Sequence, residues 1–284
     1  MHATYSVQKC AAQILPRRFC MTPAAGLTEA VLYDTLVNYL ISMARVVESA
    51  MNRALDAIIA FDNPRTSALP GEVFLLEPRI NEMEIMIDEH AIRLLRRGSF
   101  TDDEMRLVVA ALKITNDLER IGDIAVNLAE RVISLREMPD AKPPEELGPM
   151  AEAVRAMVSR SLGALIFRNA EMAAQVLESD DVVDQYRDRI FENLLQRMTQ
   201  DVALVTPGMQ FVLATRHLER IADHATNIAE DIIFWVRGLD VRHGRGLTVR
   251  PESEMTTMGL SSDVTENSHG LHSDVTPNCE TQRV

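Results

Sequence analysis

The chain has 284 residues, of which 46% are hydrophobic, 25% charged and 5% aromatic, so it is long enough to bury a core without disulfide or metal support. Acidic residues outnumber Lys and Arg by 42 to 29, and the formal net charge of −13 excludes a generic nucleic-acid binder, which needs a basic face. No apolar run reaches 18 residues, so we expect no membrane-spanning helix.

The two ends of the chain differ from its middle. Residues 1–26 contain three Lys and Arg residues and no acidic residue, and they lack the unbroken apolar segment of a secretory signal. We expect them to form a disordered leader. The three cysteines, Cys10, Cys20 and Cys279, lie near the ends, and an odd number placed there favours a reducing compartment over a disulfide framework.

The first half of the chain, residues 27–138, contains three segments with the apolar periodicity of amphipathic helices. The first has apolar residues at Leu36, Leu40, Met43, Val47 and Ala54. A stretch with Pro and Gly at 62–71 ends it. The second has apolar residues at Ile80, Met83 and Ile87.

The third segment gives the clearest helix prediction. Apolar residues from Leu107 to Leu135 alternate at steps of four and three, which predicts a helix over 102–136 that packs in a left-handed bundle. Thr101 is placed to cap this helix, with Glu104 completing a capping box.

The second half, residues 150–238, follows a Pro-rich hinge at 139–149 and repeats the first half. The segments TNDLERIGDIAVNLAE (115–130) and TRHLERIADHATNIAE (215–230) align without a gap and are identical at ten of sixteen positions. The preceding helix also repeats, at an offset of 103 residues. The chain is therefore an internal duplication.

Each half contributes three helices, and the fold class predicted is all-α, with two tandem three-helix bundles. The remaining residues, 239–284, are rich in Gly, Ser, Thr and Asp and show no sustained apolar period. We expect them to form a disordered tail.

Five polar positions are the same in both copies of the last helix: Glu119/Glu219, Arg120/Arg220, Asp123/Asp223, Asn127/Asn227 and Glu130/Glu230. Neighbouring positions differ freely, such as Asp117/His217, Ile124/His224 and Arg131/Asp231. The repeated residues follow one another at helical steps, so they form a stripe that we expect on the side away from the core. Because folding alone does not require them there, they suggest a further role.

Carboxylate and amide oxygens are ligands for hard cations such as Mg²⁺, Mn²⁺, Ca²⁺ and iron. The preceding helices offer further oxygens, Asp180 and Asp184 in the second half and Glu77 and Asn81 in the first. Each half could thus present four ligands, and the second, with four acids, is expected to bind more strongly. The alternative is a solvated face with local ion pairs to the neighbouring arginines.

Histidines add little to this prediction. His224 follows Asp223 and could be an additional ligand. His90 and His217 have no evident partner and are expected at the surface. Motifs typical of enzymes are missing from the two predicted bundles, residues 27–238, including phosphate-binding glycine loops, H-E-x-x-H, E-x-x-H and nucleophile elbows. No catalytic residue is therefore predicted.

The motifs LERIGDIAVNLAE (118–130) and LERIADHATNIAED (218–231), each on the last helix of a three-helix half, resemble the PhoU family of phosphate-specific transport accessory proteins. The resemblance covers residues 27–238. It implies a cytoplasmic negative regulator of phosphate uptake and of the phosphate regulon. The implied partners are a phosphate ABC transporter and a PhoR-type sensor histidine kinase, with membrane association only through them.

Some members of this family carry metal clusters held by E/D-x-x-x-D motifs. By position, the resemblance assigns ligands to Asp180, Asp184, Glu219 and Asp223, and to Glu77, Asn81, Glu119 and Asp123. Asn127, Asn227, Glu130, Glu230 and His224 are additional candidates. The metal would be iron, zinc, manganese or magnesium. Asn81 and the 62–71 stretch depart from the family pattern.

Two functional classes remain open from the sequence. One is a non-enzymatic regulator that acts by protein–protein contact. The other is a metal-carboxylate helical-bundle enzyme or a metal-storage protein. The regulator is favoured because catalysis would need an acid, base or nucleophile beside the metal, and the sequence offers none. A homodimer is expected only because symmetric dimers are the commonest oligomers.

Overall fold

The computed structural model describes residues 29–98, 100–242 and 247–248. The expected leader and all but a few residues of the expected tail lie outside these ranges. The described residues form α1 (Glu29–Ile59), η1 (Pro64–Thr66), α2 (Leu69–Leu95), α3 (Asp102–Arg136), α4 (Leu147–Phe167), α5 (Ala170–Leu177), α6 (Asp180–Gln200), η2 (Val202–Leu204), α7 (Val205–Arg237), β1 (Leu239–Asp240) and β2 (Leu247–Thr248). In this part of the chain, no helix is long and apolar enough to span a bilayer.

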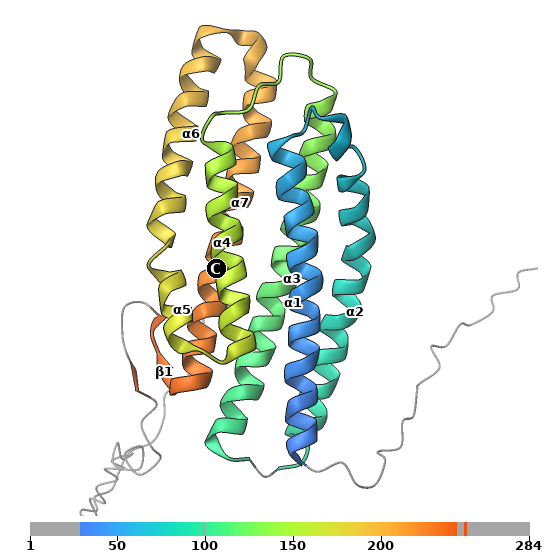
Figure 1. Cartoon of the computed structure of the whole chain (residues 1–284), viewed down its shortest axis with the longest axis vertical. Helices are drawn as coiled ribbons and strands as arrows, with labels where there is room; N and C mark the ends of the chain where they lie inside the picture. Colours follow the sequence, from blue (N-terminus) through green and yellow to red (C-terminus); the bar gives the residue numbers. More distant parts are fainter. Residues whose placement is uncertain (1–28, 99, 243–246, 249–284) are drawn as a thin grey trace, which may run out of the picture. The chain divides into compact units, whose positions relative to one another are not determined.

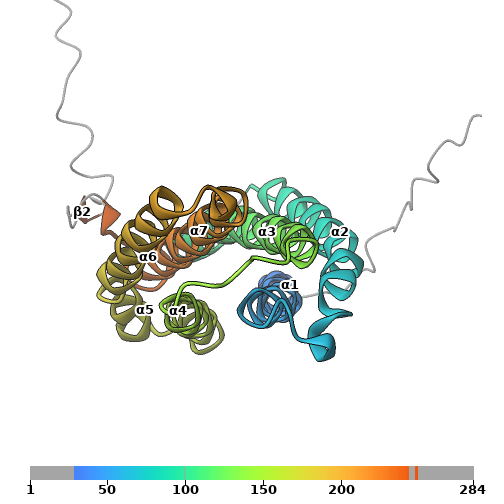
Figure 2. The same cartoon turned by 90° about the horizontal axis from the view of Figure 1, so that it is seen from above.

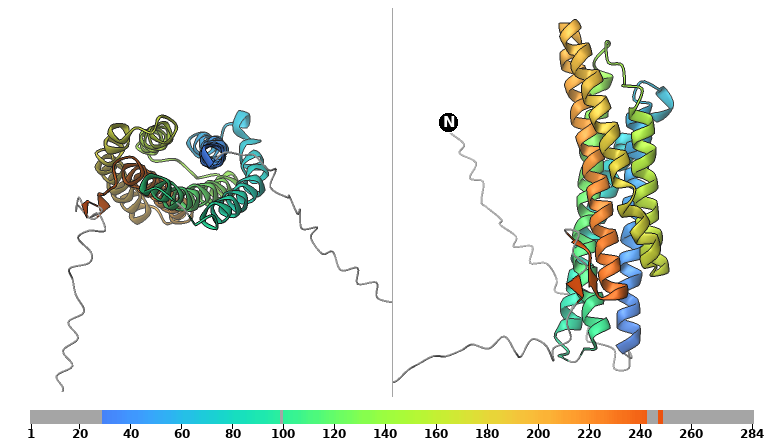
Figure 3. Two further views of the ribbon diagram at one scale, coloured as in Figure 1. Left: turned by 90° about the horizontal axis from the view of Figure 1, so that it is seen from below. Right: turned by 90° about the vertical axis from the view of Figure 1, so that its left-hand side faces the viewer.

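The helices form the two predicted bundles, which confirms the fold class (Figure 1). Helices α1, α2 and α3 pack on one another, and α7 packs on α4, α5 and α6. The bundles meet chiefly where α3 lies along α7, with a smaller contact between α1 and α4. Seen end-on, α6, α7, α3 and α2 form one layer and α4 and α1 a second (Figures 2 and 3).

The apolar seam of α3 explains why this helix forms where it does. Its seam residues from Leu107 to Leu135 are buried against the neighbouring helices. At its start, the Thr101 hydroxyl accepts a hydrogen bond from the Glu104 N–H, and the Glu104 carboxylate accepts one from the Thr101 N–H. The predicted bounds and capping box are both confirmed.

The middle helix of the second half is interrupted, which the sequence analysis did not predict. Helix α5 ends at Leu177 and α6 begins at Asp180, with Glu178 and Ser179 between them. The Ser179 hydroxyl donates to the Gln175 carbonyl, a local bond that competes with helix continuation. The first half has a single helix, α2, in the same place.

The Pro-rich stretch between α1 and α2 is fixed by an arginine from α3. Arg136 donates to three backbone carbonyls, those of Phe61, Thr66 and Ser67, at 2.8, 2.9 and 3.1 Å. Helix α2 already begins at Leu69, so it includes residues that the sequence analysis placed in the loop. Pro78 also lies inside α2, exposed on its surface, where water can reach the carbonyl that proline leaves unbonded.

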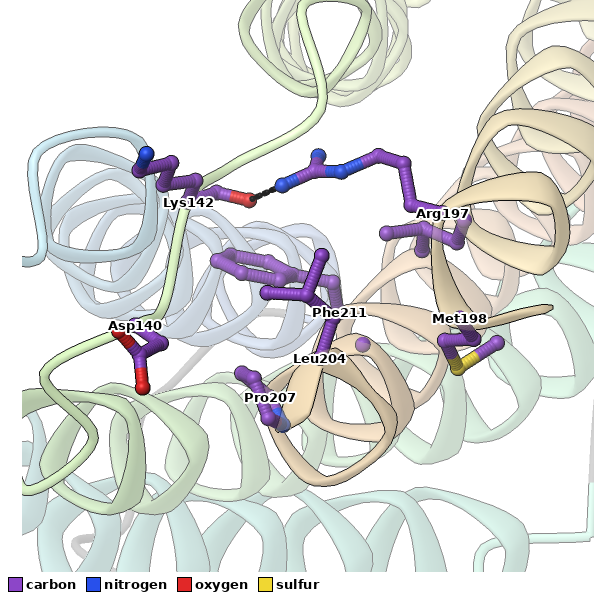
Figure 4. Close-up of a pocket in the computed structure, with 9 residues that line it drawn as sticks. Asp140, Lys142, Arg197, Met198, Leu204, Pro207 and Phe211 are labelled. Carbon is purple, nitrogen blue, oxygen red and sulfur yellow. Dashed lines mark hydrogen bonds between the residues drawn. The ribbon is translucent and has the colours of Figure 1, made fainter. Parts of the chain in front are cut away.

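The segment joining the two halves runs past the turn between α6 and α7. The Arg197 guanidinium donates to the Lys142 carbonyl at 3.2 Å (Figure 4). Figure 4 shows Asp140 and Lys142 of this segment opposite Arg197 and Met198 of α6, with Phe211 between them. The cavity that they line measures about 10 Å³, room for no more than one water molecule. Its role is therefore in packing.

The two halves use different side-chain pairs to bring their last two helices together. In the first half, Gly122 faces Ile80, and a Cβ on Gly122 would lie 3.0 Å from Ile80 Cδ1. The corresponding pair in the second half is Ala222 and Val183, both buried. A larger residue on one helix is thus matched by a smaller residue on the other, which keeps the acidic residues of the two helices close.

Candidate functional site

The predicted acids of the second half do come together between α6 and α7. The pKa of Asp180 is raised by burial and then by the negative charges of Asp223, Asp184 and Glu219. The pKa of Asp223 is raised by burial and then by Glu219, with Asp184 adding to the effect. We call Asp180, Asp184, Glu219 and Asp223 the second acidic cluster. Mutual repulsion among these carboxylates favours a cation between them.

An arginine from α6 already supplies positive charge to this cluster. Arg187 Nη1 lies 2.6 Å from Asp184 Oδ1 and 2.6 Å from Glu219 Oε1. The same guanidinium also pairs with Asp188 at 2.9 Å. These carboxylates raise the pKa of Arg187, above all through the hydrogen bond to Glu219. Arg187 was not predicted from the sequence as part of the site, although it lies three residues after Asp184 on the same helical stripe.

The first half has a different arrangement at the equivalent place. The pKa of Glu119 is raised by burial and then by Asp123, with Glu84 adding to the effect. The pKa of Glu84 is raised by burial and then by Asp88, with Asp123 also contributing. We call Glu84, Glu119 and Asp123 the first acidic cluster. Glu84 was missed by the sequence analysis, and the offset of 103 makes it the counterpart of Arg187.

In the first cluster, the positive charge paired with Glu119 and Asp123 comes from their own helix, α3. Arg120 lies 3.5 Å from Glu119 and 3.6 Å from Asp123, and its side chain is half exposed. Both distances exceed those of a charge-assisted hydrogen bond. The carboxylates here are therefore less firmly paired than those around Arg187.

The remaining predicted ligands of the first half lie on α2. Asn81 is partly buried, and its Oδ1 atom is fully buried without a hydrogen-bond partner among the described residues. Glu77 lies one turn earlier and is also partly buried. A buried carbonyl oxygen left without a donor is expensive unless a cation or water meets it. This atom therefore fits a cation ligand.

The donor set fits a hard cation in its chemistry, although the side chains would have to turn to bind one. Within the described ranges, no three or more His, Cys, Asp and Glu side chains are arranged to hold a metal ion. Both clusters nevertheless bring carboxylates from two adjacent helices together. Binding in the first half requires rotation of the acids, and binding in the second also requires Arg187 to move.

Two of the additional ligand candidates, His224 and Asn227, contact the other half. His224 Nδ1 lies 2.8 Å from Asp117 Oδ1, and Asn227 donates to the same oxygen at 3.3 Å. Glu130 lies 3.7 Å from Arg131 beside it. Asn127 and Glu230 are partly buried. His224 and Asn227 thus lie at the contact between α3 and α7, while Glu219 contacts Arg187 of the preceding helix.

Two features of the site differ from the sequence-based expectation. The stripe was expected on an open face, and Glu130, Asp223 and Asn227 are exposed, but the side chains of Glu119 and Glu219 are only 17% and 25% exposed because α2 and α6 lie beside them. The expected surface histidines are also covered. His90 is buried and its Nε2 bonds the Leu32 carbonyl at 2.9 Å, and His217 is partly buried with an unpartnered Nδ1 among the described atoms.

A groove of about 340 Å³ opens beside the second acidic cluster. Its lining includes Arg187 and Glu219 from the cluster, together with Phe191, Val212 and Arg216. The groove gives the Arg187 side chain open space next to its present position.

The sequence matches the PhoU domain family twice, at residues 40–132 and 147–232, one match for each bundle. A relative from Pseudomonas aeruginosa, named phosphate-specific transport system accessory protein PhoU homolog, is 36% identical over 225 residues, which are 78% of this chain and 90% of the relative. A relative from Pseudomonas putida with the same name is 35% identical and covers 72% of this chain and 79% of its own length.

Solved structures show the same architecture. The crystal structure of PhoU from Pseudomonas aeruginosa matches with a TM-score of 0.70 and 33% identity, covering 74% of this chain and all of that one. The phosphate transport system regulatory protein PhoU from Streptococcus pneumoniae matches with a TM-score of 0.66 at 23% identity, covering 75% of this chain and 98% of its own. This second likeness concerns the fold alone.

Proposed function

The chain belongs to the PhoU family, and on that premise we propose that it is an accessory regulator of phosphate transport that restrains phosphate uptake and phosphate-regulon signalling. The observation that carries the proposal is the match of both bundles to the family, with relatives named as accessory proteins of the phosphate transport system. Those names describe accessory and regulatory proteins, so we place this chain with regulators and not with enzymes or storage proteins.

The proposed action is protein–protein contact in the cytoplasm. The partners are the phosphate ABC transporter and a PhoR-type sensor histidine kinase, and membrane association occurs through them. The family resemblance supports these partners. A homodimer is part of the proposal, and light-scattering mass of the purified protein tests it directly, with a monomer mass counting against it.

Genetics tests the regulatory role. In a strain that lacks the gene, a reporter for a phosphate-starvation gene should be expressed at high phosphate, where the parent strain keeps it silent. A plasmid copy of the gene should restore silence. Unchanged repression in the deletion strain would reject the proposal.

We also propose that divalent or ferric ions bind at the acidic clusters. The support is the pairing of carboxylates from adjacent helices, the pKa values of Glu119 and Asp180, which burial and neighbouring carboxylates raise, and the buried Asn81 oxygen, which has no partner among the described residues. The residues that would hold the ion are Glu77, Asn81, Glu119 and Asp123, joined by Glu84, in the first half, and Asp180, Asp184, Glu219 and Asp223 in the second. A bound cation would neutralise these acids and fix the two helices relative to each other.

Elemental analysis of freshly purified protein tests metal binding. The double variants Glu119→Ala/Asp123→Ala and Glu219→Ala/Asp223→Ala should each hold less metal than the wild-type protein. The matched control is Glu89→Ala/Glu192→Ala, which removes two exposed acids at equivalent positions on α2 and α6. Equal metal in all four proteins would reject this part of the proposal.

A further inference from the structure

The two acidic clusters are equivalent by duplication but hold opposite charges at one position. The α6 residue facing the second cluster is Arg187, and its counterpart on α2 is Glu84. Arg187 contacts carboxylates of both helices of its half, Asp184 on α6 and Glu219 on α7. Glu84 adds negative charge to Glu119 and Asp123 instead.

Arg187 occupies the place where a cation would meet the second cluster. A guanidinium is charged at any pH relevant to the cell, so Arg187 cannot vacate the site by losing a proton. Its two 2.6 Å contacts are short, charge-assisted hydrogen bonds, and the side chain is partly buried. An incoming metal ion must therefore break both bonds and turn the arginine away.

The structure gives Arg187 somewhere to go. Asp188 lies at 2.9 Å on the exposed side of α6, and the 340 Å³ groove borders the same side chain. Arg216 also lines the groove, so a displaced Arg187 guanidinium would lie away from this like charge and toward Asp188. Displacement of Arg187 is thus sterically open and requires the loss of its pairing with Asp184 and Glu219.

From this geometry we infer that Arg187 is a built-in counter-cation that competes with metal ions for the second acidic cluster, so that the first cluster, which has Glu84 at the same position, binds divalent cations more tightly. This inference rests on the proposed metal binding. It reverses the expectation, drawn from the number of acids alone, that the second half binds more strongly. One chain would then carry one ready site and one that opens only when its arginine is displaced.

The test examines each acidic cluster in a protein whose other cluster has been removed, and it changes the charge at position 187 or 84. In the Glu119→Ala/Asp123→Ala background, where only the second cluster is intact, Mn²⁺ is titrated into metal-free protein by calorimetry. Adding Arg187→Gln should tighten Mn²⁺ binding by at least about tenfold, because one charge-assisted hydrogen bond is worth about tenfold to a hundredfold and Arg187 makes two such bonds with the cluster. The matched control is Arg189→Gln, an exposed arginine on the same helix that lies over the Tyr186 ring and should leave binding unchanged.

The reciprocal exchange covers the case in which Arg187→Gln fails to fold. In the Glu219→Ala/Asp223→Ala background, Glu84→Arg should weaken Mn²⁺ binding to the first cluster by at least the same factor relative to Glu84→Gln, which removes the same carboxylate without adding a cation. If Mn²⁺ binds but neither exchange alters its affinity beyond the Arg189→Gln control, the inference is overturned and the metal proposal stands. If Mn²⁺ binds to no protein in the set, the metal proposal fails and the inference fails with it.

Discussion

His90 illustrates how a single titratable residue is built into the first bundle. It is 5% exposed, its Nε2 bonds the Leu32 carbonyl, and its ring meets Tyr39 edge-on at a centroid distance of 5.5 Å. Burial lowers the pKa of His90, opposed by the bond to Leu32 and assisted by the positive charges of Arg93 and Arg97. The folded protein therefore holds this imidazole neutral at pH values where the unfolded chain protonates it.

The lowered pKa of His90 makes the free energy of unfolding depend on pH. Unfolding takes up a proton at His90 once the pH falls below the ordinary histidine pKa of about 6.5. The residue therefore lowers the free energy of unfolding as the pH falls through that value toward the lower folded pKa. We predict a smaller loss of stability between pH 7.5 and pH 5.5 for His90→Gln, which keeps an N–H donor, than for the wild-type protein. Urea unfolding at the two pH values measures this, and equal losses in both proteins would contradict it.

At the scale of helices, the contact between α2 and α3 depends on a glycine. A methyl group on Gly122 would lie 3.0 Å from Ile80 Cδ1, which is tighter than ordinary van der Waals contact. The second half has the alternative pair of Val183 and Ala222. Either pair fills the same space, so mixing them should overfill or underfill it.

We predict that Gly122→Ala and Ile80→Val are each less favourable alone than together. Gly122→Ala gains helix propensity of about 1 kcal/mol but overpacks against Ile80, while Ile80→Val alone leaves a cavity costing about 1 kcal/mol. The double variant reproduces the pair of the second half and should be more stable than the sum of the singles by about 1 kcal/mol. Chemical denaturation of the four proteins gives this coupling, and additivity within about 0.3 kcal/mol would refute it.

The elements show what the sequence could and could not predict. A heptad seam and a capping box placed α3 to the residue, because burial and capping are properties of the helix itself. The break at Ser179 and the position of Pro78 inside α2 were not predicted, since each depends on whether local bonding outweighs the packing of the surrounding bundle. An apolar seam therefore predicts where a helix runs better than it predicts where a helix is interrupted.

The candidate site was also predicted only in part from the sequence. Spacing alone brought Asp180, Asp184, Glu219 and Asp223 to one place, because residues four apart share a helix face. Arg187 and Glu84 were not predicted, although they continue the same stripe. The prediction rested on acidic residues spaced four apart, and position 84/187 has opposite charges in the two halves. The contacts of His224 and Asn227 with Asp117 were not predicted, because Asp117 lies on the other bundle and helical spacing does not show which helices pack together.

At the scale of the whole chain, the halves are joined by positions that differ between the copies. Asp117 pairs with His224, and Asp231 lies 3.2 Å from Lys113 and 3.4 Å from Arg242. Asp117 and Asp231 are both buried. What looked in the sequence like free variation is therefore complementary pairing between α3 and α7.

We predict that Asp117 and His224 are energetically coupled. Asp117→Asn and His224→Gln should each lower the free energy of unfolding, because each disrupts the partner of a covered polar group, and the double variant should lose about 1–2 kcal/mol less than the sum. Denaturation at neutral pH measures the cycle. A control cycle of His224→Gln with the exposed Glu192→Gln should be additive, and additivity in both cycles would rule out the coupling.

The role proposed for this two-bundle protein is to restrain phosphate uptake. Its most direct test is the initial rate of radiolabelled phosphate uptake in phosphate-replete cells, comparing the parent strain, a strain lacking the gene and that strain carrying a plasmid copy. If the protein restrains uptake, phosphate should enter the deletion strain faster than the parent strain, and the plasmid copy should restore the parental rate. The same uptake rate with and without the gene would contradict it.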